Sequence, residues 1–145
     1  MTMETKMNKP ILCLDFDGVI HSYTSGWQGA ANITDPPVDG AMLWIERAVE
    51  RFRVHVYSSR SHQAGGIDAM RGWLHMHLAL ELEDYARAKQ VLNQIEWPQE
   101  KPPALVTIDD RAITFDGTWP SLDDIASFTP WNKRPSPSLP MVKEM

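Results

Sequence analysis

The sequence predicts an α/β protein in which helices flank a mostly parallel β-sheet. Short apolar runs alternate with longer segments of helical periodicity, a pattern typical of this layered class. Two of the runs, 10–16 and 104–108, are nearly continuous in apolar side chains, as expected of strands that are buried on both faces. Both runs lead into closely spaced aspartates, so the expected sheet carries acidic groups where its strands end.

The spacing of apolar residues predicts the remaining elements. Between 40 and 52, apolar residues recur at mostly helical intervals with charged residues between them, which indicates an amphipathic crossover helix. The segment 67–78 is a second expected helix, and 81–90 is a third. The remaining expected strands are 53–57, 91–97 and 112–115.

The chain is predicted to form one domain with a long flap and a proline-rich tail. Its 145 residues, 43% of them hydrophobic, suffice for one complete core. Segment 19–38 is rich in Gly, Ser, Thr, Asn and Pro and is too long for an ordinary connection, so we expect a functional flap folded as a loose hairpin. The domain is expected to span 1–128, and the prolines of segment 129–145 disfavour regular structure there.

Composition and charge narrow the functional classes. With 19 acidic and 14 basic side chains, a net charge of -5, the surface would on average repel a nucleic-acid backbone, although a local basic groove remains compatible. The single cysteine, Cys13, excludes an internal disulfide and favours a reducing compartment. Segment 1–9 lacks the apolar core of a secretory signal, and no stretch is long and apolar enough to cross a bilayer. We therefore expect a cytoplasmic protein without a membrane partner.

Acidic residues at the predicted strand ends indicate a magnesium site. Asp15 and Asp17 are two residues apart, so their side chains project to the same side if the extended geometry persists. Asp109 and Asp110 follow the other buried strand, and parallel strands present their carboxyl ends at one edge of a sheet. Mg2+ prefers such hard oxygen ligands.

The same residues carry a resemblance to a known family. Segment 14–19, Leu-Asp-Phe-Asp-Gly-Val, resembles the first motif of the haloacid dehalogenase-like hydrolase superfamily, most of whose members are phosphatases. Segment 54–58 is similar to the second motif, Lys101 with Pro102 to the third, and segment 106–110 to the fourth, so the resemblance covers 11–116. It implies a Rossmann-like three-layer sandwich with the first-motif strand central in the sheet.

The resemblance implies a phosphatase mechanism in which each matched side chain has a role. Asp15 would attack phosphorus and form an aspartyl phosphate. Asp17 would protonate the leaving alcohol and then activate water, a role that burial and a neighbouring anion would favour by resisting ionisation. Ser58 would bind a phosphoryl oxygen, and Lys101 would offset the negative charge shared by nucleophile and phosphate.

Magnesium is the cofactor that the resemblance implies. Its ligands would be the Asp15 carboxylate, the Asp17 main-chain carbonyl and a fourth-motif acid. Asp110 takes the place of the acid in the family's Gly-Asp form of this motif, and Asp109 is the alternative ligand.

The expected substrate is a phosphorylated small molecule or polymer end. The intervals where the family inserts cap domains are filled by the flap, helices and strand, which implies an open site beneath the flap. Such sites often accept large substrates or are closed by oligomerisation, so a homo-oligomer is compatible. Arg60, His62 and Arg111 would suit a second phosphate, and the Asp-Asp-Arg sequence at 109–111 resembles the phosphatase half of polynucleotide kinase-phosphatases. The residues expected to contact substrate are Gly18, His21, Trp27, Ser59, Arg60 and Arg111.

Other classes remain open from the sequence. The segment 15–18 taken alone is equally compatible with a solvated turn after a strand. A receiver-like domain also holds an aspartyl phosphate beside magnesium, although its acid pair precedes the phosphoacceptor by a whole βαβ unit. A third class is a module that binds a phospholigand or nucleic-acid end without turnover, which the presence of Asp17 argues against.

Overall fold

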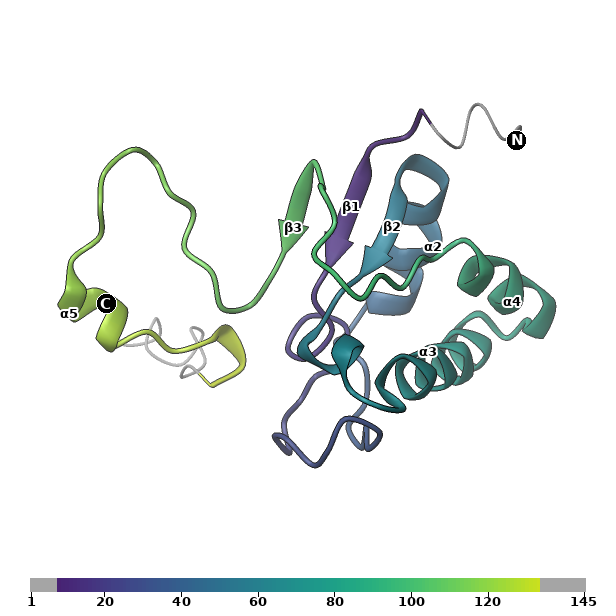
Figure 1. Cartoon of the computed structure of the whole chain (residues 1–145). Helices are drawn as coiled ribbons and strands as arrows, with labels where there is room; N and C mark the ends of the chain where they lie inside the picture. Colours follow the sequence, from purple (N-terminus) through teal and green to yellow (C-terminus); the bar gives the residue numbers. More distant parts are fainter. Residues whose placement is uncertain (1–7, 134–145) are drawn as a thin grey trace, which may run out of the picture. The chain divides into compact units, whose positions relative to one another are not determined.

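A computed structural model describes residues 8–133 and divides the chain into two compact units, which meet in the sequence at Asp109 and Asp110. Each unit is described by itself. The first unit contains the labelled sheet and the three longer helices of Figure 1. Its elements are β1 (Ile11–Leu14), α2 (Ala41–Arg51), β2 (Arg53–Val56), the 3-10 helix η1 (Ser59–His62), α3 (Gly66–Leu82), α4 (Tyr85–Asn93) and β3 (Val106–Ile108).

The sheet of the first unit is parallel, and its strand order is β2-β1-β3 (Figure 1). Leu12 of β1 pairs with Val54 on one side and with Val106 on the other. The expectation of an α/β fold around a parallel sheet is therefore confirmed. The strand that precedes Asp15 is the central strand of the three.

The two faces of the sheet differ in chemistry. Leu12 and Leu14 alternate with Cys13, and Val54 and Val56 alternate with His55, so the apolar members share one face. These apolar residues join one buried core with the helices, whose contributions include Met42, Ile45, Met70, Leu74, Val91 and Leu92. Cys13 and His55 occupy the other face, where His55 pairs with Glu96 of the segment that follows α4. The helix layer therefore covers the apolar face.

The predicted helices are present with shifted ends. Helix α2 matches the predicted crossover helix and buries Met42, Ile45 and Val49. Helix α3 runs further than predicted, to Leu82, and ends at Glu83, whose φ of 53° is left-handed. The predicted strand at 91–97 is wrong, because Val91 and Leu92 belong to the buried face of α4 and Glu96 alone forms an isolated bridge.

The predicted flap, residues 19–38, leaves and re-enters the core with its two ends antiparallel. Ser22 donates its backbone N–H to Pro36, and Val38 donates to Ile20. His21 forms an isolated antiparallel bridge with Pro37, in agreement with a loose hairpin. Backbone hydrogen bonds at the base of the flap thus join its two ends to each other.

The second unit begins at Asp110 and contains the short helix α5 (Leu122–Ala126) and the 3-10 helix η2 (Trp131–Lys133). The Ser121 hydroxyl caps α5 by accepting the Asp124 N–H. The edge strand predicted at 112–115 is wrong, since these residues adopt no regular structure. Most of the predicted tail, 134–145, lies outside the described residues. Within residues 8–133, none of the helices has the length and apolar character needed to cross a bilayer.

Candidate active site

Three of the predicted catalytic residues line one cavity of about 240 Å³ in the first unit. They are Asp15, Ser58 and Lys101, which are far apart in the sequence. The cavity is also lined by Cys13, Tyr57, Ser59, Thr107 and Asp109. Residues that carry a carboxylate, a hydroxyl and an ammonium group therefore line the same small space.

The ends of the strands position these groups. Asp15 follows β1 directly, and its backbone N–H donates to the carbonyl of Ile108 in β3. Tyr57 follows β2 and donates its N–H to Leu14. The ladder thus continues one residue beyond each strand and fixes where the Asp15 and Ser58 side chains begin.

Ser58 is buried and its hydroxyl orientation is constrained. Its Oγ accepts the Arg60 backbone N–H at 3.0 Å, and its own N–H donates to the Ser61 hydroxyl at 3.1 Å. These bonds form a capping box at the start of η1. Because the Oγ already accepts, its proton remains able to donate to a phosphoryl oxygen in the cavity.

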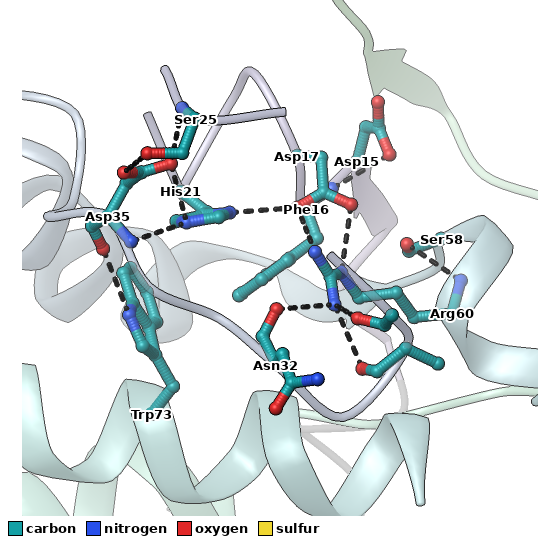
Figure 2. A network of polar contacts seen from close by, with 12 residues as sticks. Asp15, Phe16, Asp17, His21, Ser25, Asn32, Asp35, Ser58, Arg60 and Trp73 are labelled. Carbon is teal, nitrogen blue, oxygen red and sulfur yellow. Dashed lines mark hydrogen bonds and ion pairs between the residues drawn. The ribbon is translucent and has the colours of Figure 1, made fainter. Parts of the chain in front are cut away.

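The Asp17 carboxylate faces a different set of partners (Figure 2). Its Oδ1 accepts from His21 Nδ1 at 2.8 Å and from Arg60 Nη2 at 3.1 Å, and its Oδ2 accepts from Arg60 Nε at 2.9 Å. Asp17 is not among the described residues that line the cavity of Asp15. The expectation that both side chains project to one side required extended geometry up to residue 17, whereas β1 ends at Leu14.

The ionisation of Asp17 also differs from the expectation. Burial by itself raises the pKa of this carboxyl, but the hydrogen bonds from His21 and Arg60 and the positive charge of Arg60 outweigh it. The pKa of Asp17 is therefore held below its usual value. Asp17 does not resist ionisation in this arrangement, and its carboxylate form is stabilised.

His21 links Asp17 to the flap. Its Nε2 accepts the backbone N–H of Asp35 at 3.1 Å, and a backbone N–H can only donate. The network therefore assigns the proton to Nδ1, which donates to Asp17. The ring is 1% exposed and packs against Phe16 and Trp73. His21, which was expected to contact substrate, is thus enclosed in the structure.

Arg60 is also enclosed, with 0% of its surface exposed. Besides Asp17, its Nη1 donates to the carbonyls of Gly29 and Ala30, both at 2.9 Å, and more weakly to Asn32 at 3.4 Å. The guanidinium holds the flap and Asp17 together, and its donors are used by the protein (Figure 2). The structure therefore offers no open Arg60 surface for a second phosphate.

The other predicted contact residues have separate positions. Trp27 is 47% exposed, and its ring lies 4.8 Å from the Arg60 guanidinium carbon. Gly18 turns the chain after Asp17 with a φ of 85° and donates its N–H to His21. Ser59 lines the cavity. Arg111 belongs to the second unit, where its Nε lies 3.9 Å from an Asp110 carboxylate oxygen.

Oxygen ligands suitable for a metal are present in the first unit. Asp15 and Asp109 each place a carboxylate oxygen within 4.8 Å of the other, and both line the cavity. Carboxylate oxygens are hard ligands of the kind that Mg2+ prefers. These two lie close enough together to bind one ion. Asp110 is the first residue of the second unit.

Sequence reasoning missed several residues of this region. Cys13 and Thr107 are paired between β1 and β3, and both line the cavity. Alternate residues of a strand share a face, so this placement could have been predicted from the sequence if the pairing of the strands had been known. Burial raises the pKa of the Cys13 thiol, in keeping with an unreactive side chain. Asp35 and its partner Ser25, which support His21, carry no sequence signal beyond their place in the flap.

Comparisons with known proteins add no assignment. No family model matches the chain, and no curated protein or solved structure gives a significant match.

Proposed function

We propose that this protein is a magnesium-dependent phosphatase that hydrolyses a phosphate monoester through an aspartyl phosphate on Asp15. The observation that carries the proposal is the shared cavity of Asp15, Ser58 and Lys101. These side chains come from three separate places in the sequence, and the resemblance implies a role in phosphoryl transfer for each of them. A shared role in phosphoryl transfer explains why these three residues line one cavity better than chance does.

In the first half-reaction, an Asp15 carboxylate oxygen attacks phosphorus, the bond to the alcohol oxygen breaks with its electron pair, and that oxygen takes a proton from water because Asp17 is ionised in the resting arrangement. Ser58 donates its hydroxyl proton in a hydrogen bond to a phosphoryl oxygen, and Lys101 offsets the negative charge in the cavity. In the second half-reaction, water attacks phosphorus, the bond to Asp15 breaks, and phosphate leaves. Asp17, ionised in the resting arrangement, is suited to accept the proton of that water once Arg60 releases it.

Magnesium fits the oxygen ligands of this cavity. Asp15 and Asp109 would hold it with the Asp17 main-chain carbonyl, and Asp110 is the alternative acid in the sequence. When bound, the ion would offset the charge of the phosphoryl group in the transition state.

The finer fold assignment is part of the same proposal. We infer a fold of the haloacid dehalogenase-like class without a large cap domain, supported by the central position of β1 and the parallel order β2-β1-β3. A cytoplasmic location and a phosphorylated small molecule or polymer end as partner belong to this proposal as well.

The decisive experiment measures phosphate release from a panel of phosphate monoesters in the presence of Mg2+, with wild type beside Asp15→Asn. Asp15→Asn removes the nucleophile while nearly preserving size, so release should fall by at least about a thousandfold while the circular dichroism spectrum is retained. Near-native rates in Asp15→Asn would exclude the covalent mechanism.

A second candidate function is a domain that accepts a phosphoryl group on Asp15 and holds it, or binds a phospholigand without turnover. The engagement of Asp17 by His21 and Arg60 favours this reading, because a restrained Asp17 cannot easily activate water. Acetyl phosphate labelling followed by mass spectrometry separates the two functions. A phosphorylated chain that persists for hours supports the second, and rapid release of phosphate supports the first.

A further inference from the structure

A second cavity of about 390 Å³ lies along the same stretches of chain that line the cavity of Asp15. Its polar lining residues are Ser61, His62, Gln63, Asp68 and Gln99. Its size falls within the range of about 300–1,000 Å³ that is common for sites of small molecules. It belongs to the first unit and includes none of the residues assigned above to catalysis.

Neighbouring stretches of chain line the two cavities. Tyr57, Ser58 and Ser59 line the first cavity, and Ser61, His62 and Gln63 follow them along the second. In the same way, Lys101 lines the first and Gln99 lines the second. The Tyr57 hydroxyl lies 3.0 Å from His62 Nε2, so one contact joins the walls of the two cavities. Residues close together in the chain therefore line both cavities.

The lining of the second cavity selects the kind of group that would enter it. Gln63 and Gln99 offer amides, which donate and accept hydrogen bonds, and Asp68 offers a carboxylate, which accepts from hydroxyl groups. No Lys or Arg is among the described residues that line this cavity, and Asp68 would repel a second phosphate. Nor does a Phe, Tyr or Trp line it, and its one aromatic ring among the described lining residues, His62, already packs edge-on against Tyr57.

We propose that this second cavity binds the alcohol portion of the substrate and selects a small, hydroxyl-rich monoester of the sugar phosphate class. The proposal rests on the proposed phosphatase function, since the first cavity must hold the phosphoryl group. It distinguishes among the substrates compatible with the sequence, because a nucleotide, a bisphosphate or a nucleic-acid end brings charges or rings to which this cavity offers no Lys, Arg, Phe, Tyr or Trp among its described lining residues.

The test compares kcat/KM for glucose 6-phosphate with that for p-nitrophenyl phosphate, and uses the ratio of the two. Gln99→Ala removes an amide, and Asp68→Asn replaces a charged acceptor oxygen by an N–H donor, so each should lower this ratio about fivefold to tenfold. Glu81→Gln is the matched control, because it removes an exposed carboxylate near the far end of the same helix, α3. The ratio should remain at the wild-type value in that control.

A charge reversal sharpens the test. Asp68→Lys should raise kcat/KM for fructose 1,6-bisphosphate relative to glucose 6-phosphate by at least about tenfold, because the added ammonium group attracts the second phosphate. Esters that are hydrolysed with ratios unaffected by Gln99→Ala and by both Asp68 variants would overturn this proposal alone. A preference for adenosine monophosphate or a 3'-phosphorylated oligonucleotide over every sugar phosphate would also overturn it. Absence of turnover on every ester would instead remove the phosphatase function, and this inference with it.

Discussion

The Nδ1 atom of His21 lies 2.8 Å from Oδ1 of Asp17, while its Nε2 accepts the Asp35 N–H at 3.1 Å. One buried imidazole thereby connects Asp17, the second aspartate of segment 14–19, with Asp35 near the end of the flap. The position of Asp17 depends on this ring as well as on Arg60, and the flap is part of the support of the site.

Replacing His21 should test this connection. His21→Ala removes both hydrogen bonds and leaves a cavity beside Phe16 and Trp73, so the free energy of unfolding should fall by about 3 kcal/mol. His21→Asn places an amide near the position of Nδ1 and should recover about 1 kcal/mol by donating to Asp17. Urea unfolding followed by tryptophan fluorescence measures both. Equal stabilities of the two variants would show that the contact to Asp17 contributes nothing.

Arg60 should be far more important for stability than an exposed arginine in a similar ion pair. Arg60→Ala leaves Asp17 and flap carbonyls without their buried donors, so the free energy of unfolding should fall by about 3–5 kcal/mol. Arg53→Ala is the control. Its pair with Glu96 is partly exposed, at 3.3 Å, and its loss should cost less than about 1 kcal/mol. Denaturant unfolding measures both variants. Similar decreases in the free energy of unfolding for Arg60→Ala and Arg53→Ala would contradict this prediction.

Two glycines of α3 should respond oppositely to alanine. A methyl group at Gly66 would overlap the carbonyl oxygen of Arg60, so Gly66→Ala should destabilise the protein by about 2 kcal/mol or more. A methyl group at Gly72 meets no atom within 4 Å, and Gly72→Ala should stabilise the helix by about 0.5–1 kcal/mol. Thermal unfolding measures the difference, and a stabilising Gly66→Ala would mean that η1 and α3 are packed less closely than described.

Asp35 should make part of the stability depend on acid pH. The Ser25 hydroxyl and N–H donate to its carboxylate at 2.6 and 2.8 Å and lower its pKa from the usual 3.8. The folded state therefore binds this proton less readily than the unfolded state. The resulting stabilisation is complete above the unfolded-state pKa and is lost as the pH falls through the lower folded-state value.

Ser25→Ala removes the hydroxyl donor, so it should reduce the free energy of unfolding by about 1–2 kcal/mol at pH 7. The difference in free energy of unfolding between wild type and variant should shrink below about pH 4, as the pH passes the unfolded-state pKa of 3.8. The reason is that the hydrogen bond from Ser25 stabilises the ionised form of Asp35, and this form is lost on protonation. Urea titrations from pH 3 to pH 7 measure this trend. A difference that stays constant over the whole range would assign the Ser25 effect to packing.

The two neighbouring fourth-motif acids should differ in their effect on magnesium. Asp109 shares the cavity of Asp15, so Asp109→Asn should raise the Mg2+ concentration needed for half-maximal phosphate release by at least about tenfold. Asp110→Asn is the matched comparison at the next position. A larger shift in Asp110→Asn would favour the ligand expected from the family motif, and activity that persists in excess chelator would exclude magnesium.

The local sequence pattern was sufficient for the main elements of the first unit. Continuous apolar residues before Asp15 and after Pro103 predicted strands β1 and β3. The expected burial is found in β1, but it is wrong for β3, whose three residues are exposed at the edge of the described sheet. Apolar residues at helical spacing predicted α2, because a helix with one buried face requires them every three or four positions. The pattern failed at 91–97, where a short apolar run fits the buried face of a helix as well as a strand. The motifs also predicted Asp15, Ser58 and Lys101 as partners, and these do share a cavity.

By itself, the sequence determined which chemical groups are available and which elements carry them, since both depend on residue identity and short-range periodicity. Only the tertiary structure decided what surrounds each group. Arg60 is a plausible phosphate ligand in the sequence, but folding buries it between Asp17 and the flap carbonyls, where its donors are already used. Contacts of this kind join residues about 30 to 40 positions apart, and no local pattern encodes them because they arise from how the chain packs.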